Sequence, residues 1–460
     1  MECPSDRDTP SFYGGVWGAL TPFAFFLAGV AALGLAGAPD ERGFWPVLLG
    51  SLGLGLAVAR DRRAYAESYL HGMSQPIVMT MVLAWLLAGV LGSCLGASGL
   101  IDALTGLAER FGVRGGGFAL AAFAICATVS TATGTSLGTI LVCGPLLYPA
   151  GAGAAAAPPV LIGAILGGAT FGDNLSPVSD TTIASSTTQG ATMADVVRSR
   201  LGFALPAALL AAVAFAVLGG GAPPAATSAG PESEVGPGPL VMLLAPAASI
   251  ILLLRRRHLV EGLLVGCGVA VAIGLLGGWI AGSELLWLDR ESFVARGLLL
   301  EGMERAVGIS FFTLLLMGLV APIQAAGVLH GLVAPRQGTG SRRAAELSIF
   351  AAVSAAALLT AHSVVAILTV GARARELGEA HGIPAPRRAN LLDVTVCTYP
   401  FLLPFYIPTI LAAATTASGY ASGMPRVSPW QAGLHNFHSW ALLLLLVGSI
   451  ALRGRRRQGT

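Results

Sequence analysis

The residues best suited to chemistry lie in one stretch, "GATFGDNLSPVSDTTIASSTTQG", at positions 168–190. It directly follows the apolar run "PVLIGAILGGATF", yet it contains two aspartates and a proline. Its carboxylate, amide and hydroxyl oxygens are hard ligands, which suit a small alkali cation and not a soft metal. The oxygen-bearing side chains are those of Asp173, Asn174, Ser176, Ser179, Asp180, Thr181 and Thr182. We predict an ion or substrate site here, with Asp173 and Asp180 as candidate ligands of a cation such as Na⁺.

The position of this stretch within an apolar region strengthens the prediction. Counted from Pro159, Asp173 lies near the middle of a hydrocarbon core roughly 30 Å thick. Pro177 removes a helical hydrogen bond, and unwound backbone at that depth is tolerated only against protein or a water-filled cavity. The alternative is a kink whose polar groups merely bind one another. An aspartate at the membrane centre costs roughly 2.5–3.5 kcal/mol, so two of them in one segment favour a transport site.

Three other polar segments could complete the site. "TGTS" lies midway along the region 117–149, where the tip of a hairpin would fall, although close helix packing explains its small residues equally well. A second polar tip falls within the region 344–370, and a second acid precedes Pro400. For the histidine of this set, a structural role and a proton-carrying role are both open. The candidate ligands are Thr133, Gly134, Thr135, Ser136, Thr360, His362, Ser363, Asp393 and Thr395.

Helices that cross a membrane must position these segments. Of the 460 residues, 54% are hydrophobic and only 11% are charged, which is too little charge for the surface of a soluble protein. Apolar runs of about 20 residues span a bilayer. We expect such spans near 16–36, 43–59, 76–96, 200–220, 239–254, 259–281, 305–324 and 434–452. Four further regions, 117–149, 158–186, 344–370 and 391–417, are interrupted by Gly, Ser, Thr or Pro.

The arginines predict the orientation, because cytoplasmic loops carry an excess of basic residues. Arginines follow the second span, form the cluster at 255–257, flank the region 344–370 and close the chain. The loops 149–158 and 222–238 contain none. We therefore expect a multi-pass protein of the inner, cytoplasmic membrane with both termini in the cytoplasm. Arg198 and Arg200 belong to the cytoplasmic set in this interpretation, so no arginine is expected within the site.

Two stretches of the chain contain the same features in the same order. One begins with Gly72-Met and the other with Gly302-Met, and in both an apolar span, a short amphipathic piece, a hairpin region and a broken span follow. The first copy starts inside and the second outside, an arrangement typical of secondary transporters. We predict an all-α polytopic membrane protein with two inverted repeats, each holding a re-entrant hairpin and a broken transmembrane helix. The expected parts are N-terminal helices (1–70), the first repeat (71–221), an external loop (222–238), linking helices (239–300), the second repeat (301–420) and a C-terminal helix with a basic tail (421–460).

The run "FGDNLSPVSDTT" resembles the signature of the NhaC-type Na⁺/H⁺ antiporter family, Gly-Asp-(Lys/Asn)-x-Ser-Pro-x-Ser-Asp-Thr-Thr. "TGTS" is similar to the Thr-Gly-Thr-Ser element of that family. "NLLDVTVCTYP" is loosely similar to its "LEDSGTVTSP" stretch, with Asp393 on the second acid. The resemblance extends over residues 70–420. It implies an ion-transporter fold, a homodimer in membrane lipid, and Na⁺ and H⁺ as coupling ions with no other cofactor.

The chain departs from the family pattern at two points. Ala361, His362 and Ser363 stand where the family often has Gly-Asp-Gln, and Leu392 and Asp393 stand where it has an acidic pair. The loss of two acids should alter cation coordination or proton stoichiometry. Relatives of this kind also exchange organic acids, such as malate against lactate, so the transported species stays open.

Three functions compete. A carboxyl group withdrawn from water holds a proton or a cation but not both, which would couple Na⁺ (or Li⁺) to H⁺ in an antiporter. A carrier of small carboxylates would use helix N-termini to meet the anion. An intramembrane hydrolase would use the serine of "GTSLG", but no histidine motif at catalytic spacing accompanies it. We expect the protein to be an antiporter and not an enzyme. A net charge of +3, with no aromatic residues interleaved in the basic clusters, gives no reason to expect a nucleic-acid partner.

Overall fold

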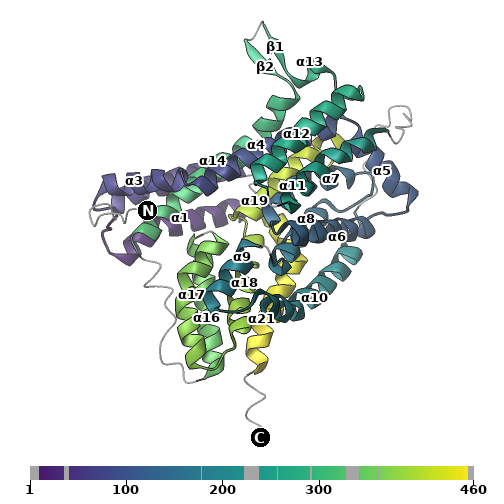
Figure 1. Ribbon diagram of the computed structural model, residues 1–460. Helices are drawn as coiled ribbons and strands as arrows, with labels where there is room; N and C mark the ends of the chain where they lie inside the picture. Colours follow the sequence, from purple (N-terminus) through teal and green to yellow (C-terminus); the bar gives the residue numbers. More distant parts are fainter. Residues whose placement is uncertain are drawn as a thin grey trace.

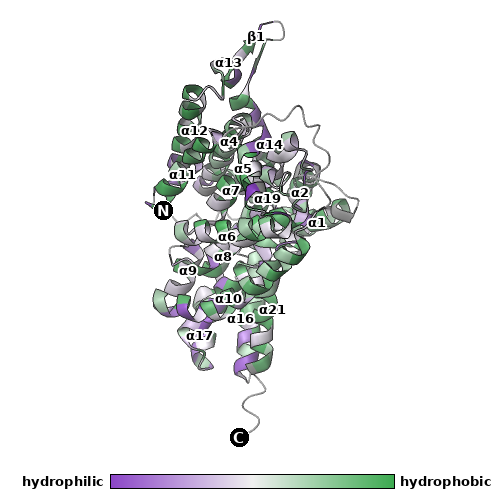
Figure 2. Cartoon of the chain, turned by 90° about the vertical axis from the view of Figure 1, so that its right-hand side faces the viewer, coloured by the Kyte–Doolittle hydropathy of each residue, from purple (hydrophilic) through white to green (hydrophobic). Residues whose placement is uncertain are grey.

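The computed structural model describes residues 10–35, 41–177, 179–221, 238–255, 257–290, 293–327, 341–360 and 362–453. Within these ranges the chain is helical apart from loops and one antiparallel hairpin, formed by β1 (Trp287–Asp289) and β2 (Val294–Arg296). The hairpin projects at the top of Figure 1, and helices α16 (Arg342–Thr360) and α17 (Ser363–Ala380) lie at the lower end. Most of the helices are apolar along much of their length (Figure 2). The prediction of an all-α polytopic membrane protein is confirmed at this level.

The remaining elements follow in chain order. Before the long loop at 222–238, which lies almost wholly outside the described residues, they are α1 (Val16–Leu35), η1 (Glu41–Phe44), α2 (Trp45–Val58), α3 (Arg62–Met73), α4 (Pro76–Ala97), α5 (Leu100–Arg110), α6 (Gly116–Thr133), α7 (Ser136–Ala150), α8 (Pro158–Leu175), α9 (Asp180–Gln189) and α10 (Met193–Leu218). After it they are η2 (Gly238–Leu243), α11 (Leu244–Leu254), α12 (Leu259–Leu276), α13 (Gly282–Leu285), α14 (Leu298–Ala325), α18 (Ala385–Val396), η3 (Tyr399–Phe401), α19 (Ile407–Thr415), η4 (Thr416–Ser422), α20 (Pro429–Leu434) and α21 (Phe437–Arg453).

Seven of the described helices are long and apolar enough to cross a membrane: α1, α4, α6, α10, α12, α14 and α16. Five of them correspond to predicted uninterrupted spans, whereas α6 and α16 are arms of the interrupted regions. The predicted spans at 43–59, 239–254 and 434–452 are shorter apolar helices. Helix α10 begins at Met193, seven residues before the predicted span, because the Thr192 hydroxyl caps it by accepting from the Asp195 N–H at 3.2 Å.

Each of the four interrupted regions consists of two helices with a break between them. Between α6 and α7, Gly134 has φ +73°, a left-handed conformation that favours glycine, and Thr135 caps the start of α7. Helix α8 ends at Leu175 and α9 begins at Asp180, and Pro177 stands between them. Helix α16 ends at Thr360 and α17 begins at Ser363, and residues 397–406 separate α18 from α19 around the short helix η3. The polar stretches of the sequence therefore lie at or beside the ends of helices.

Helices α4 and α14 pack against each other in opposite directions. A Cβ atom on Gly89 would lie 2.0 Å from the Gly302 carbonyl oxygen, so the two backbones touch at this point. Towards the other end of α14, Gly72 of α3, the helix that directly precedes α4, lies against the Met317 carbonyl and the Ala321 side chain. Because α4 and α14 are the matching spans of the two proposed repeats, their antiparallel contact is the relation that an inverted repeat requires.

The loops that follow the two hairpins lie at opposite ends of α10. At its C-terminal end, the Ala157 N–H donates to the Gly219 carbonyl at 2.9 Å, and Ala156 pairs with Gly220. At its N-terminal end, the preceding helix α9 contacts α17 and α18, with the Gln189 amide donating to the Gly371 carbonyl at 2.8 Å. The loop from α7 to α8 and the loop from α17 to α18 are thus separated by a helix of 26 residues.

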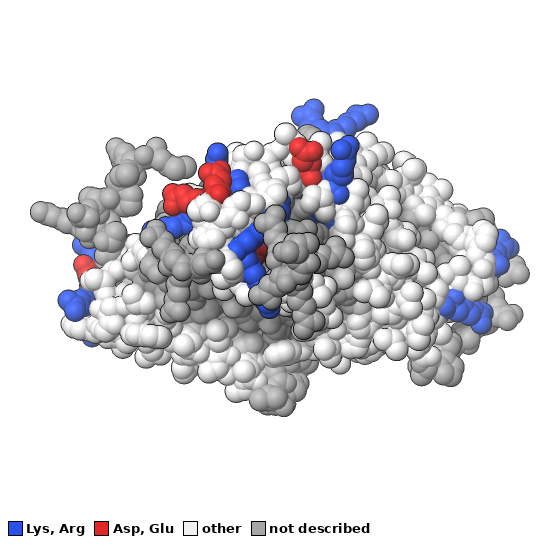
Figure 3. Space-filling model, turned by 90° about the horizontal axis from the view of Figure 1, so that it is seen from below, with Lys and Arg blue, Asp and Glu red and all other residues white. Residues whose placement is uncertain are grey.

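Among the described residues, the charged side chains on the lower face of the molecule gather in a few groups (Figure 3). Helices α16 and α17, which lie at this end in Figure 1, carry the ion pairs Arg342–Glu346 at 3.6 Å and Arg375–Glu379 at 2.9 Å. This distribution agrees with the prediction that the arginines around the region 344–370 share one side.

Candidate functional site

Asp173 lies in the last turn of α8, directly before the break. Its Oδ2 accepts a hydrogen bond from the Ser136 hydroxyl at 2.7 Å, and its Oδ1 accepts one from the Ser179 hydroxyl at 2.6 Å. Ser136 is the first residue of α7, and Ser179 is the residue that precedes α9. The carboxylate therefore joins the tip of the first hairpin to the break between α8 and α9. Both donors are neutral hydroxyls, which hold the carboxylate without cancelling its charge.

A cavity of about 460 Å³ opens beside this carboxylate. The tip of the second hairpin forms part of its wall through His362 and Ser363, and Asp180 faces it with a largely exposed side chain. Asp173 and Asp180 thus share one space. The predicted site residues that line the cavity are Thr133, Gly134, Thr135, Ser136, Asp173, Ser179, Asp180, Thr181, His362 and Ser363.

Two helix N-termini meet at this cavity. Helix α7 begins at Ser136 and α17 begins at Ser363, so the partial positive charge of each helix end lies near the carboxylates. Thr360 supports the second tip, since its hydroxyl donates to the Ala356 carbonyl at 2.8 Å and accepts from the His362 N–H at 3.3 Å. The arrangement can hold a cation on the carboxylates or an anion at the helix ends.

The turn between α11 and α12 forms another part of the wall. Arg257 and His258 both line the cavity, and both side chains are exposed. This turn includes part of the arginine cluster at 255–257, which we predicted from the sequence to be cytoplasmic. A basic group of this kind would attract an anion to the cavity.

Arg200 corrects one prediction, because it lies among the candidate ligands and not in a cytoplasmic loop. Its side chain is completely buried. Its Nη2 pairs with Asp393 Oδ2 at 2.6 Å, and its Nη1 donates to the Thr182 hydroxyl at 2.7 Å and to the Asn174 carbonyl. The expectation that no arginine falls within the site was wrong. Sequence reasoning missed this residue, although it stands eight positions into a helix that starts at the Thr192 cap.

The other predicted residues lie outside the cavity wall, in the buried structure behind it. Asp393 accepts from the Ser185 hydroxyl at 3.0 Å in addition to its ion pair. The Thr395 hydroxyl donates to the Leu391 carbonyl of its own helix at 2.6 Å, and the Asn174 side chain lies beside the Cys397 thiol. The members of this second group are Asn174, Ser176, Thr182, Thr360, Asp393 and Thr395.

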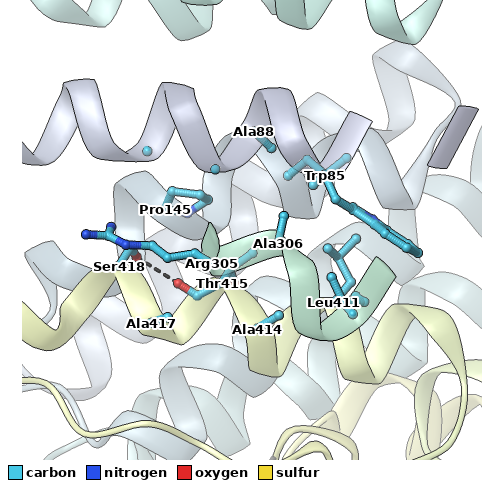
Figure 4. Close-up of a pocket in the computed structure, with 14 residues that line it drawn as sticks. Trp85, Ala88, Pro145, Arg305, Ala306, Leu411, Ala414, Thr415, Ala417 and Ser418 are labelled. Carbon is cyan, nitrogen blue, oxygen red and sulfur yellow. Dashed lines mark hydrogen bonds between the residues drawn. The ribbon is translucent and has the colours of Figure 1, made fainter. Parts of the chain in front are cut away.

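A second, smaller crevice of about 50 Å³ lies further along the same helices (Figure 4). The large cavity is lined by Met81 of α4, Leu137 of α7 and Pro408 of α19, and the crevice by Trp85, Leu141 and Leu411 of the same three helices. On each helix the two spaces are one turn apart. Arg305 of α14 is the charged residue in the wall of the crevice.

The chemistry of the large cavity fits a hard cation. Its polar wall presents carboxylate and hydroxyl oxygens, the ligands that alkali cations prefer. Among the described residues, no group of three or more His, Cys, Asp or Glu side chains could hold a transition-metal ion.

Comparison with known proteins agrees with this chemistry. The profile of the Na⁺/H⁺ antiporter family matches residues 54–220. The chain is 32% identical over 166 residues to the malate-2H⁺/Na⁺-lactate antiporter of Bacillus subtilis strain 168. The aligned segment covers 36% of this chain and 35% of that protein. It is 30% identical over 157 residues to the Na⁺/H⁺ antiporter NhaC of Alkalihalophilus pseudofirmus, covering 32% of this chain and 33% of the relative.

The NhaC antiporter of Bacillus subtilis strain 168 is 32% identical over 159 residues, and 34% of each chain is covered. In each case the matched segment spans about a third of the curated relative. All three of these relatives are named as antiporters. Over residues 54–220, which contain the hairpin tip, the broken helix and Arg200, the predicted resemblance to NhaC-type Na⁺/H⁺ antiporters is confirmed.

Proposed function

We propose that this protein is a secondary transporter that exchanges Na⁺ or Li⁺ for H⁺ across a cell membrane, with Asp173 as the carboxylate that both ions use. One observation carries the proposal. Asp173 lies at a break between two helices, beside a cavity, and is bound by two neutral hydroxyl donors. A carboxylate in this setting can hold a proton or a cation, and the two compete. The similarity of residues 54–220 to antiporters supports the same function.

Competition at Asp173 couples the two fluxes when the site opens to one side at a time. A cation that enters displaces the proton, which leaves by the open side, and a proton bound on the other side displaces the cation. The large cavity would be the cytoplasmic opening, because Arg257 and His258 line it. The crevice around Trp85, Leu141 and Leu411 would be the closed outer path, one helical turn away.

This mechanism rests on an inverted repeat, which we include in the proposal. The two hairpins, α6–α7 and α16–α17, would enter the membrane from opposite sides and meet at the cavity. The antiparallel contact of α4 with α14 supports the inversion, and so do the hairpin loops at opposite ends of α10. The cytoplasmic location of both termini, the inner-membrane location and assembly as a homodimer stay proposals of the same account.

The test measures exchange of Na⁺ or Li⁺ for H⁺ in proteoliposomes whose interior is more acidic than the medium. Addition of Na⁺ or Li⁺ outside should dissipate the gradient, seen as recovery of fluorescence from a pH-sensitive dye. Asp173→Asn should abolish this recovery, because an amide cannot release a proton. Asp102→Asn is the matched control, since Asp102 is an exposed carboxylate on α5 away from the cavity. Wild-type exchange in folded Asp173→Asn protein would refute the assignment of Asp173.

A second function, exchange of small carboxylates, has one observation in its favour. The cavity of about 460 Å³ is much larger than a bare cation needs, and two helix N-termini and Arg257 surround it. Such groups bind a carboxylate anion. One relative is named a malate-2H⁺/Na⁺-lactate antiporter, which gives the candidate substrates.

The same liposomes separate the two functions. Malate and lactate are supplied in place of Na⁺, and then together with it. A fluorescence response to Na⁺ alone supports the cation antiporter. A response that requires an organic acid supports the carboxylate exchanger, and Arg257→Gln should then weaken the apparent affinity for the acid.

A further inference from the structure

Arg200 is a buried cation at the point where the two halves of the site meet. It stands in α10, whose N-terminal end is capped by Thr192, and its side chain has no exposed surface. Arg198, two residues earlier on the same helix, is exposed. Because residues two apart lie on nearly opposite faces of a helix, only Arg200 of the two points inwards.

The guanidinium lies among four oxygen atoms from four residues. Nη1 donates to the Asn174 carbonyl, at the end of α8, and to the Thr182 hydroxyl of α9 at 2.7 Å. Nε donates to the Asn390 side-chain oxygen at 3.0 Å, and Nη2 pairs with Asp393 at 2.6 Å. The group therefore binds both arms of one broken helix and the first arm of the other.

This set of oxygens is what a hard cation requires: a carbonyl freed by a helix break, a hydroxyl, an amide oxygen and a carboxylate. A guanidinium never loses its charge at physiological pH, so it stays a cation in this place. Asp393, with no exposed surface and the guanidinium at 2.6 Å, is already neutralised. Among the described residues, Asp173 makes no ion pair, and its charge is free to bind a transported ion.

We propose that Arg200 fills a second cation site with a permanent cation from the chain itself. Its guanidinium takes the place of a bound ion between the two breaks. Asp393 then positions the breaks and does not exchange ions, and the exchangeable charge stays on the cavity side, at Asp173. The inference deepens the proposed function and rests on it, because it assumes that Asp173 binds the transported cation.

The experiment removes the first site and opens the second. Na⁺ binding to purified full-length protein is measured by calorimetry for Asp173→Asn, for Asp173→Asn/Arg200→Ala and for the matched control Asp173→Asn/Arg198→Ala. We expect no saturable Na⁺ binding to the single variant or to the control. We expect the variant without Arg200 to regain one Na⁺ per chain, because its four oxygens and the Asp393 charge have lost their cation.

Two outcomes are distinguishable. A folded Asp173→Asn/Arg200→Ala protein that binds no Na⁺ would overturn the second site and leave the proposed function standing. Saturable binding by Asp173→Asn alone would instead overturn the role of Asp173. The folded state of each variant is checked by size-exclusion chromatography and by its thermal transition.

A second measurement keeps the inference testable if the alanine variant does not fold. Arg200→Lys retains a cation and Arg200→Met retains the length of the side chain without the charge. We expect Arg200→Lys to unfold at a higher temperature than Arg200→Met, and we expect added Na⁺ to raise the transition temperature of Arg200→Met more than that of the lysine variant. Equal transition temperatures with equal responses to Na⁺ would overturn the proposal, because the oxygens would then have no need of a cation.

Discussion

At the scale of single residues, the two central acids differ in what binds them. Asp173 accepts from two hydroxyls, whereas Asp393 faces a guanidinium and the Ser185 hydroxyl. Hydroxyl donors stabilise a carboxylate but leave its net charge for a transported ion. An arginine cancels that charge. In our account, Asp173 therefore exchanges ions and Asp393 positions the helix breaks, although both stand next to such a break.

Ser136→Ala should weaken apparent Na⁺ affinity about tenfold, because a hydrogen bond to a charged group contributes roughly 1.5 kcal/mol or more. The variant removes the donor to Asp173 Oδ2 and leaves the Ser179 donor in place. Thr128→Ala on α6 is the control, since the Thr128 hydroxyl is exposed and bonds within its own helix. Concentration dependence of Na⁺-driven dequenching measures the effect. Equal affinities for the two variants would contradict this role of Ser136.

Asp180→Glu should weaken apparent cation affinity more than it lowers the maximal rate. Asp180 faces the cavity from the first turn of α9, and an extra methylene moves its carboxylate relative to Asp173 without removing the charge. The same titration gives both parameters. An affinity equal to that of the wild type would show that Asp180 does not bind the ion and has a structural role.

At the scale of elements, glycines set the closest helix contact. The backbones of α4 and α14 touch at Gly89 and Gly302, which a side chain at either position would prevent. This contact fixes the antiparallel pair against which α3 and α12 also pack. The pair forms the frame on which the site cavity and the crevice are built, since Met81 and Trp85 of α4 line them.

Gly89→Ala should destabilise the protein by about 1–3 kcal/mol, the usual effect of overpacking. The added Cβ would lie 2.0 Å from the Gly302 carbonyl oxygen. Gly96→Ala is the matched control on the same helix, because nothing lies within 4 Å of its added Cβ. Thermal unfolding in detergent compares the two. The account of this contact fails if Gly89→Ala is as stable as Gly96→Ala, which should be stabilised by the better helix propensity of alanine.

The breaks could be predicted from the sequence because their causes are local. Pro177 cannot continue a helix, Gly134 takes a left-handed conformation, and Thr135 supplies a cap. The residues that bind the side chains at these breaks could not be predicted, because they come from distant parts of the chain. Ser136 and Asp173 are 37 positions apart, and Arg200 and Asn390 are 190 apart.

Arg200 shows where the sequence interpretation failed. An arginine near the end of a span usually belongs to a loop, so the positive-inside rule counts it there. The Thr192 cap and Asp195 move the start of α10 seven residues earlier, which places Arg200 two turns inside the helix. The cap was visible in the sequence. The burial of Arg200 depends on its partners Asn174, Thr182 and Asp393, which only the fold brings together.

At the scale of the whole molecule, the account requires that the two hairpins enter from opposite faces. Single cysteines in a Cys-free background test this at Gly153, in the loop after α7, and at Ala380, the last residue of α17. Both positions are at least partly exposed. A membrane-impermeant thiol reagent should label position 153 in intact cells and position 380 only after permeabilisation. Labelling of both in intact cells would contradict the inverted repeat.

The claim that joins all three scales is competition between Na⁺ and H⁺ for Asp173. It is tested by calorimetric titration of the purified protein with Na⁺ in weakly buffered solution over a series of pH values. The account predicts that Na⁺ binding releases a proton, that apparent affinity falls towards tenfold for each unit of acidification, and that Asp173→Asn shows neither effect. Na⁺ binding without proton release, or proton release that persists in Asp173→Asn, would contradict it.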